Sequence, residues 1–418
     1  MIERDIKKRV VITGMGALTP LGLSVGDTWS ALVAGRSGIG LITQFDASQL
    51  PIRIAGEVKG FDPAQYIDFK EARRMARCSH LAVAAATQAM ADAGLGDQVP
   101  DPERSGTVMG TGVGGMEMAL EGWETYKAKG IRRVSPFVSA ASLCNMPAHH
   151  VSLRFQCQAY NATVVTACAS GTQAIGEATE AIRRGAAELM LAGGVEGMVH
   201  EVIMVSFIAM RVLAADNEHP EQACKPFDAR RDGFCSAEGT AVMVLERLDK
   251  ALDRGARIYA EVLGYSANTD AYHVAIPDPE GAGAVRVMRW ALENAGVSPA
   301  EIEYINAHGP GTDVGDRAET TAIKRLFGER AYRVPISATK SMVGHALGGA
   351  GAIEALACVK TITEGVIHPT INYEVPDPEC DLDYVPNVAR QADVRVTLSN
   401  SFGLGGQNAC LVLSRFEE

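Results

Sequence analysis

The sequence predicts an α/β fold made of two similar halves, with helices packed between and around two sheets. Three observations lead to this prediction: β-branched apolar runs that end in glycine turns, helical segments that follow them, and a weak internal repeat of that order. At 418 residues the chain exceeds the usual size of one domain, so a duplicated unit is expected. We place the halves at residues 1–256 and 257–418, related by a pseudo-twofold axis.

The first elements follow the α/β pattern. Residues 9–16 are typical of a buried strand that ends in a glycine turn, and residues 28–34 of a short helix. Further on, an alanine-rich helix ends with ADAGL at residues 91–95, and a strand then enters the small-residue loop 109–112. These elements define the first copy of the repeat.

The second copy has the same order. A helix from Val285 to Ala295 ends with ENAGV, and the strand 304–306 enters the loop Ala307-His308-Gly309. Later in each half another helix follows a polar segment; one ends at Gly185 and the other at Gly365. The match of order in both halves favours a duplication.

Composition and charge narrow the classes of function. The chain is 47% hydrophobic and 21% charged with 43 glycines, which is typical of a globular protein, and no apolar run is long enough to span a membrane. The start shows no secretory signal, and nine scattered cysteines without CxxC pairs favour reduced thiols, so we expect a cytoplasmic protein. A net charge of -11 gives no support to nucleic-acid binding.

One cysteine has the position of a nucleophile. In VTACASG, Cys168 lies between a β-branched strand and the start of a small-residue helix. The amides and partial positive charge of a helix N-terminus favour the thiolate. The other eight cysteines are better explained as packed side chains.

Two histidines lie in glycine-flanked loops that would let a substrate approach closely. His308 lies in NAHGPGT, and His345 lies in KSMVGHALGG, which begins with Lys340. Together with Cys168 they form a chemically useful set. One cysteine and two histidines could also bind zinc, but zinc sites usually show closer ligand pairs and supporting carboxylates, so no metal is expected.

Three glycine-rich stretches need separate interpretations. Residues 14–17 and 110–115 resemble parts of a dinucleotide fingerprint, but neither completes it, so tight turns and close helix packing are favoured. Residues 400–408 (NSFGLGGQN) follow a predicted strand at 394–398. Their exposed amides could form an oxyanion hole.

The motifs VTACASG, NAHGPGT, KSMVGHALGGAG and NSFGLGGQN resemble, in order and spacing, those of the β-ketoacyl-acyl carrier protein synthases of the thiolase superfamily. The elongating type II enzymes of fatty-acid synthesis are the most similar group, and the likeness runs from VVITGMGALTPLG to NACLVLSR. The resemblance implies a duplicated αβαβα thiolase-like fold, usually a homodimer, and decarboxylative Claisen condensation of an acyl group with malonyl-acyl carrier protein. It implies no cofactor and no metal.

The resemblance also implies roles for single residues. Cys168 would carry the acyl group, His308 and His345 would promote decarboxylation, and Lys340 would support His308. The amides of Cys168 and Leu404 would form the oxyanion hole beside Phe402. The remaining implied residues are the supporting carboxylates Glu319 and Asp316 and the substrate-contacting Thr312, Val113 and Phe207.

Four residues depart from the family's usual motifs. Pro310 removes one hydroxyl that would contact pantetheine, although Thr312 remains, and Gln407 replaces a threonine. Leu404 stands where a bulky phenylalanine usually gates the acyl pocket. Val113 stands where isoleucine is frequent at the pocket floor, which would deepen the acyl tunnel slightly.

The implied partner, acyl carrier protein, is acidic, so an acidic enzyme needs a local basic patch to attract it. Lys70, Arg73, Arg74 and Arg77 have the spacing of one helical face. A second cluster includes Arg132 and Arg133, and Arg211 lies elsewhere in the chain. We expect these residues to dock the carrier.

Three other functions compete with chain elongation in fatty-acid synthesis. A ketosynthase of a type II polyketide or polyene pathway would use the same mechanism, and Pro310, Leu404 and Gln407 point mildly to it. A non-catalytic chain-length partner subunit would lack the nucleophile, which Cys168 argues against. A coenzyme A-dependent thiolase would use a cysteine as its second base, where this chain has a histidine.

Overall fold

The computed structural model describes residues 5–417 and shows two sets of five strands joined edge to edge. The strands of the first set are β1 (Val10–Leu18), β4 (Ser105–Gly110), β5 (Asn161–Val164), β6 (Leu189–Glu196) and β7 (Gly239–Arg247). Those of the second set are β8 (Ala260–Thr269), β9 (Tyr304–Asn306), β10 (Ile336–Ser337), β13 (Val396–Gly403) and β14 (Gln407–Ser414).

The two sets have the same topology. The sheet order is β5-β4-β6-β7-β1 in the first set and β10-β9-β13-β14-β8 in the second, so each strand has a counterpart at the same place. Parallel and antiparallel pairings also correspond, for example β4 with β6 and β9 with β13, which are both parallel. The predicted duplication into two pseudo-symmetric halves is therefore confirmed.

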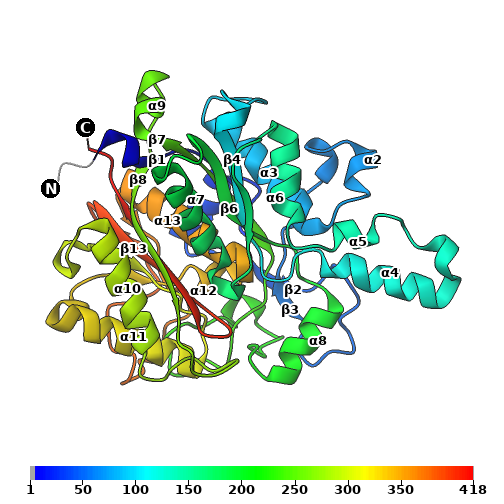
Figure 1. Ribbon diagram of the computed structural model, residues 1–418. Coiled ribbons are helices and arrows are strands. Elements are labelled where there is room, and N and C mark those ends of the chain that lie inside the picture. Colours follow the sequence, from blue (N-terminus) through cyan, green and yellow to red (C-terminus); the bar gives the residue numbers. More distant parts are fainter. Residues whose placement is uncertain (1–4, 418) are drawn as a thin grey trace.

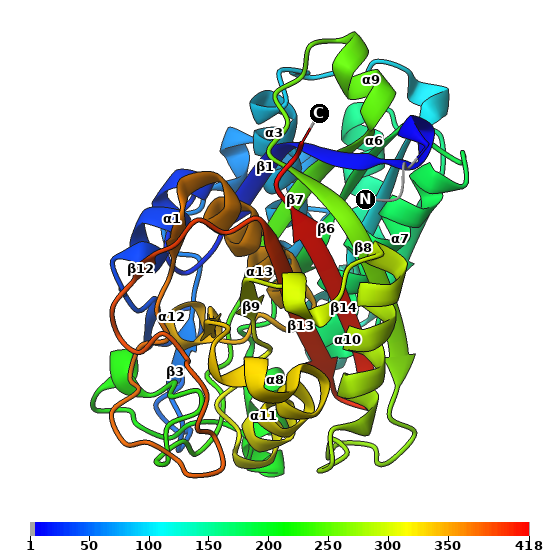
Figure 2. The same cartoon turned by 90° about the vertical axis from the view of Figure 1, so that its left-hand side faces the viewer.

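The sequence predicts two separate sheets, but in the structure the two sets of strands are joined at one point. Strand β1 pairs with β8 through Val11 opposite Glu261 and Ile12 opposite Ala260, so a single ten-stranded sheet results (Figure 2). The two strands that form this link, β1 and β8, occupy corresponding places in the two halves.

Helices between and outside the two sets of strands complete the layers (Figure 1). Helices α7 and α13 pack on each other between the two sets of strands, α3 and α6 cover the outer face of the first set, and α10 and α11 cover the second. Their bounds are α3 (Arg77–Asp92), α6 (Met146–Phe155), α7 (Ser170–Arg183), α10 (Ala282–Ala295), α11 (Asp313–Phe327) and α13 (Leu347–Glu364).

The small residues noticed in the sequence explain this close packing. A Cβ on Gly16 of β1 would lie 2.0 Å from the carbonyl oxygen of Ala85 in α3, so only glycine fits there. The interpretation of residues 14–17 as an element of close helix packing is confirmed. Both central helices are almost wholly buried and supply much of the main core.

Shorter elements surround this framework. The helices are α1 (Val25–Val33), α2 (Phe69–Ala72), α4 (Met116–Lys129), α5 (Val138–Ala141), α8 (Glu201–Met210), α9 (Leu248–Asp253) and α12 (Lys340–Val343). Two small strand pairs are β2 (Ile39–Leu41) with β3 (Ile54–Gly56), and β11 (Val366–Ile367) with β12 (Arg390–Gln391). Within residues 5–417, no helix has the length and apolar character needed to cross a bilayer.

Candidate active site

Cys168 lies in the predicted turn between a strand and a helix. Strand β5 ends at Val164, a short 3-10 helix covers Ala167–Ala169, and α7 begins at Ser170. Ala167 has a φ of 50°, a left-handed conformation that is strained for a residue with a Cβ. The Ser170 hydroxyl fixes the turn because it accepts from the amide of Thr166 at 2.9 Å and donates to the carbonyl of Ala167 at 2.7 Å.

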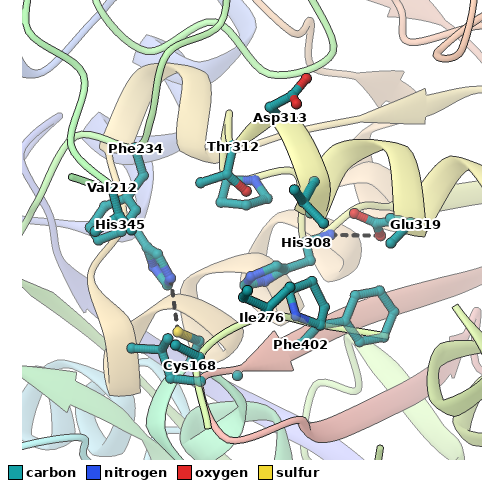
Figure 3. Close-up of a pocket in the computed structure, with 18 of the residues that line it drawn as sticks. Cys168, Val212, Phe234, Ile276, His308, Thr312, Asp313, Glu319, His345 and Phe402 are labelled. Atoms are coloured by element: carbon teal, nitrogen blue, oxygen red, sulfur yellow. Dashed lines mark hydrogen bonds between the residues drawn. The ribbon is translucent and has the colours of Figure 1, made fainter. Parts of the chain in front are cut away.

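His345 and His308 converge on the cysteine from the second half of the chain (Figure 3). The Nε2 atom of His345 lies 3.0 Å from Sγ of Cys168. The two imidazole rings stand 5.4 Å apart between centroids and nearly perpendicular, at 80°. The ring of Phe234 packs against His345 at 5.2 Å and excludes water from that side.

Lys340 lies behind His308, as the resemblance implied. Its Nζ atom is 3.3 Å from Nδ1 of His308 and donates to the His308 carbonyl at 2.6 Å. Since an ammonium group can only donate, Nδ1 accepts and the ring proton of His308 resides on Nε2. Glu354, a buried residue of α13, forms an ion pair with Lys340.

Two buried carboxylates hold the loop that carries His308. Glu319 accepts from the amides of His308 at 2.9 Å and Gly309 at 2.8 Å. Asp316 accepts from the amides of Gly311 at 3.1 Å and Phe227 at 2.7 Å. Both acids lie in α11, so this helix fixes the backbone on either side of the loop.

The site is electrically neutral at the cysteine and the histidines. Burial raises the pKa of the Cys168 thiol to about 11, while the amides of Leu404 and Cys168 and the charge of Lys340 oppose the rise. Burial, reinforced by the charge of Lys340, lowers the pKa of both His308 and His345 well below the usual value. The sequence-based expectation that the helix start favours a thiolate is therefore wrong for this state, because loss of solvent outweighs the helix amides.

The predicted oxyanion residues adjoin the nucleophile. The amides of Leu404 and of Cys168 itself both face Sγ closely enough to lower the pKa of the thiol. The ring of Phe402 lies beside that of His308, with 5.8 Å between the centroids. Amides aimed at one point in a buried site are suited to a developing oxyanion.

Two cavities meet at this group. The first, of about 330 Å³, is lined by Cys168, His308, His345, Thr312, Arg211 and Phe402, among others. The second, of about 380 Å³, has almost wholly apolar walls that include Val113, Phe207 and Met116. Leu347 and Leu404 line both, so the residue at the expected gate position stands between the cavities.

The same three side chains lie close enough together to share a metal ion. One ligand atom each of Cys168, His308 and His345 lies within 4.8 Å of the others. The donor set fits poorly, however, because a histidine ligand usually donates its other ring N–H to a carboxylate or carbonyl. Here Nδ1 of His308 faces the ammonium of Lys340, and Nδ1 of His345 has no hydrogen-bond partner in residues 5–417.

The basic residues do not form the predicted single helical face, and that expectation is wrong. Helix α2 ends at Ala72, and α3 begins at Arg77. Arg73 and Arg74 therefore lie in the turn between the two helices. Arg77 turns inward and forms an ion pair of 2.5 Å with the fully buried Glu238. Lys70, Arg73 and Arg74 are exposed.

The other predicted docking residues are accessible. Arg132 and Arg133 are exposed at the end of the segment that follows α4, and Phe137 just beyond them packs under the guanidinium of Arg74 at 4.6 Å. Contact between these segments brings the two basic clusters to one side of the molecule. Arg211 lies at the end of α8 in a left-handed conformation and lines the first cavity.

Sequence reasoning missed two residues close to the site. Glu354 is a lone acid in the apolar run AGAIEALACV, and a charge in such a run is a signal that a buried partner exists. Phe234 gave no comparable signal, because its packing on His345 depends on tertiary structure alone.

Comparisons with known proteins agree with this geometry. Residues 7–251 match the family model of the beta-ketoacyl synthase N-terminal domain, and residues 259–374 match that of the C-terminal domain. A 3-oxoacyl-acyl-carrier-protein synthase 2 of Synechocystis sp. is 46% identical over 411 residues, which cover 98% of this chain and 99% of that protein. The protein of the same name from Coxiella burnetii is 44% identical over 409 residues, with the same coverage.

Solved structures give the same result. A beta-ketoacyl synthase from Burkholderia phymatum superposes with a TM-score of 0.91 at 37% identity, covering 98% of this chain and 100% of that one. The ishigamide ketosynthase/chain length factor gives 0.90 at 36%, covering 98% and 99%. A type II polyketide ketosynthase, solved with its acyl-carrier protein and bound to the hexaketide, gives 0.88 at 33% with the same coverage.

Proposed function

Because this chain belongs to the beta-ketoacyl synthase family, we propose that it is a 3-oxoacyl-acyl-carrier-protein synthase of fatty-acid elongation. It joins an acyl group held on Cys168 to a malonyl unit with loss of carbon dioxide. The observation that carries this proposal is the convergence of Cys168, His308 and His345 where two cavities meet.

The first half-reaction loads the enzyme. Sγ of Cys168 attacks the carbonyl carbon of an acyl thioester, and the tetrahedral oxyanion accepts hydrogen bonds from the amides of Cys168 and Leu404. The S–C bond to the carrier breaks, and the carrier thiol leaves with the proton that Sγ gave up. The acyl chain then lies along the apolar cavity past Leu404.

The second half-reaction makes the carbon–carbon bond. Malonyl thioester loses carbon dioxide, and the negative charge of the resulting enolate falls on its thioester oxygen. The Nε2–H of His308 donates to this oxygen, with His345 beside it, in a pocket that Phe234 and Phe402 keep dry. The enolate carbon attacks the acyl carbon, and Cys168 leaves as thiolate and regains a proton.

Lys340, Glu319 and Asp316 act on this reaction through His308 and its loop. Lys340 holds the tautomer of His308, and Glu354 neutralises the lysine charge in the buried site. Glu319 and Asp316 fix the loop backbone. Substituting these residues should therefore change the rate of decarboxylation more than that of acyl loading.

The decisive experiment is intact-protein mass spectrometry after incubation with acyl carrier proteins that bear acyl chains of different lengths. A mass increase equal to the acyl group, lost in Cys168→Ala, supports the proposal, and the preferred chain length follows from the same data. Acylation that persists in Cys168→Ala would contradict the assignment.

A polyketide or polyene ketosynthase is the second candidate, favoured by Leu404 between the two cavities and by Pro310 in the histidine loop. The smaller side chain of Leu404 leaves more room than phenylalanine would for a chain that carries polar groups. The identities of 44–46% to the 3-oxoacyl-acyl-carrier-protein synthases 2, against 33% to the type II polyketide ketosynthase, favour the first candidate. Loading of Cys168 from a 3-oxoacyl donor would favour the second, because fatty-acid elongation requires reduction of that group first.

Acyl carrier protein is the proposed partner. Lys70, Arg73 and Arg74 with Arg132 and Arg133 offer exposed positive charge on one side of an otherwise acidic molecule, and Arg211 stands at the cavity mouth. An acidic carrier would be steered to this surface while its thioester enters the first cavity. Arg77 is left out of the proposed surface because Glu238 engages it.

We also propose a homodimer that works in the cytoplasm. Strand β5 is an outer strand of the sheet, and Val165 directly after it is 48% exposed, which supports pairing with a second copy. All nine cysteines are free thiols, as a reducing compartment would keep them. Light scattering of the purified chain would show twice the mass of 44.3 kDa.

The halves 1–256 and 257–418 are proposed as the two domains of the enzyme. The repeated strand order and the start of β8 at Ala260 support a boundary there. The first half then carries the nucleophile, and the second carries both histidines, Lys340 and the glycine-rich oxyanion loop.

A further inference from the structure

A buried arginine contacts residues that line the first cavity but lies outside the group of reacting residues. The side chain of Arg231 is only 1% exposed, although its guanidinium is charged. Burial of a charge is costly unless partners satisfy it, so its contacts indicate what it holds in place.

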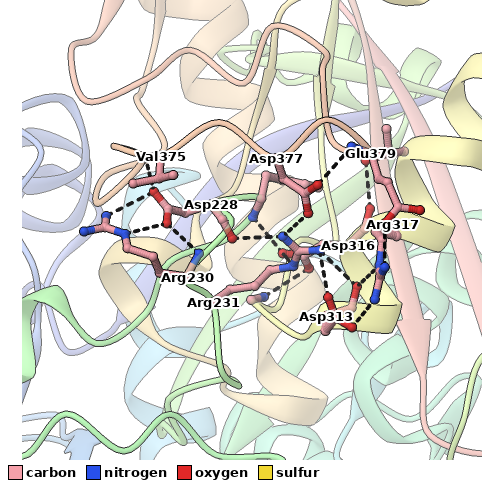
Figure 4. A network of polar contacts seen from close by, with 12 residues as sticks. Asp228, Arg230, Arg231, Asp313, Asp316, Arg317, Val375, Asp377 and Glu379 are labelled. Atoms are coloured by element: carbon pink, nitrogen blue, oxygen red, sulfur yellow. Dashed lines mark hydrogen bonds and ion pairs between the residues drawn. The ribbon is translucent and has the colours of Figure 1, made fainter.

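Those contacts join one turn of the chain to other segments around it (Figure 4). Nε of Arg231 donates to the carbonyl of Thr312 at 3.4 Å, and Nη2 donates to the carbonyl of Asp313 at 3.2 Å and to its carboxylate at 3.3 Å. Nη1 donates to the carbonyl of Asp228 at 2.9 Å and to the carboxylate of Asp377 at 2.7 Å. Arg231 therefore ties the turn at 312–313 to two other segments.

The turn at 312–313 faces the cavity. Thr312 lines it just before α11 begins, and Figure 3 shows Thr312 and Asp313 at the side opposite Cys168. The Thr312 hydroxyl makes no hydrogen bond with other groups of residues 5–417, and it caps no amide of α11. This hydroxyl is free to bind a ligand that passes through the mouth.

The two residues before Thr312 have no free hydrogen-bond donor to offer a ligand. Pro310 has neither a hydroxyl nor an N–H to offer. The amide of Gly311 is already bound to Asp316, at 3.1 Å. Asp316 thus fixes the turn through the amide of Gly311, and it also pairs with Nε of Arg231 at 3.7 Å. Arg231 in turn fixes the carbonyl groups of the turn.

We propose that Arg231 is a positioning residue for the pantetheine arm of carrier-bound substrates, acting through Thr312. The arm carries amides and hydroxyls along its length, and a threonine hydroxyl held at a fixed point of the mouth binds one of them. The inference rests on the proposed function, since it requires a pantetheine thioester as substrate. Arg231 itself touches no reacting atom.

The test compares two acyl donors with the same acyl group, a pantetheine thioester and an N-acetylcysteamine thioester, which keeps only the sulfur end of the arm. Arg231→Met should raise KM for the pantetheine donor roughly tenfold, the scale of one hydrogen bond, and leave kcat nearly unchanged. KM for the short donor should change less than about twofold. Arg230→Met is the matched control, because Arg230 pairs with Asp228 and Glu374 in the same network without contacting residues 312–313.

Two further variants guard against misfolding. Arg231→Lys keeps the charge but loses the fork of donors, and we expect an intermediate KM. Thr312→Val removes the hydroxyl, and the double variant Arg231→Lys/Thr312→Val should then match Thr312→Val alone. Additive effects, or equal losses with both donors, would overturn the inference. A wild-type protein that accepts neither donor would overturn the proposed function, and the inference with it.

Discussion

The Nε2 atom of His345 lies 3.0 Å from Sγ of Cys168, yet the two groups form no ion pair at rest. Burial raises the pKa of the thiol to about 11 and holds that of His345 well below its usual value. The thiol therefore keeps its proton at neutral pH. Acyl loading must then move this proton while Sγ attacks.

The first prediction concerns the pH dependence of Cys168. Because only the thiolate reacts with iodoacetamide, and its fraction rises tenfold per pH unit below the pKa, alkylation should accelerate about a hundredfold between pH 7 and 9. Peptide mass spectrometry of timed reactions measures this rate at Cys168 separately from the other cysteines. Free cysteine, with a pKa of about 8.5, is the control, because its rate should level off above that pH. A plateau near neutral pH would instead show that the helix amides stabilise the thiolate.

The second prediction separates the two histidines from the nucleophile. His308→Ala should lower malonyl decarboxylation by about 10²-fold or more, the usual effect of losing one oxyanion donor, while acyl transfer to Cys168 stays measurable. His345→Ala should have the same effect on decarboxylation and should also slow acylation, since His345 alone of the pair contacts Sγ.

Release of carbon dioxide and acylation of the intact protein are measured in parallel for each variant. Lys340→Met should resemble His308→Ala, because the ring of His308 then loses the donor that sets its tautomer. Equal losses of both half-reactions in His308→Ala would contradict this division of roles.

Much of the fold could be predicted because its signals are local. The strand at 304–306 and the helices that end near residues 92, 183, 295 and 364 follow from apolar runs closed by glycine. The single sheet could not be predicted, since it depends on two residue pairs between β1 and β8. Pairing between distant strands leaves no periodic pattern in either one.

The motifs predicted which residues lie together in the candidate site, but they did not predict the electrostatics of those residues. A helix start beside Cys168 predicts a low pKa, whereas the opposite shift comes from burial that only the packed structure produces. The prediction that Arg77 docks the carrier was wrong for a related reason. Residue spacing alone cannot show that the helix ends at Ala72 and that a new one begins at Arg77, nor that the side chain of Arg77 pairs with the buried Glu238.

The third prediction concerns the apolar cavity. Val113 and Phe207 both line it, so Val113→Phe would fill part of its roughly 380 Å³ and shorten the acyl chain that fits. Acylation by short chains should continue at a similar rate, while acylation by long chains should fall at least about tenfold. Intact-protein mass spectrometry with a mixture of donors reports both in one sample. Val205→Phe is the matched control, because Val205 lies in the same helix as Phe207 but is exposed and does not line the cavity, so both rates should stay unchanged. A uniform loss in Val113→Phe with none in Val205→Phe would contradict the assignment of this cavity to the acyl chain.

The last prediction concerns the encounter with the carrier. Reversal of charge in Arg73→Glu/Arg74→Glu should raise KM for carrier-bound substrate about tenfold, and added salt should weaken the wild type by screening. Substrates on coenzyme A have no carrier surface to dock, so their turnover should hardly change.

Arg77→Met should instead lower the melting temperature, because it leaves the buried carboxylate of Glu238 without its cation. Lys7→Glu/Lys8→Glu makes the same change of net charge at exposed positions before β1 and should leave KM for the carrier unchanged. If Arg73→Glu/Arg74→Glu loses both kinds of substrate equally, the residues support the fold and the carrier binds at another surface.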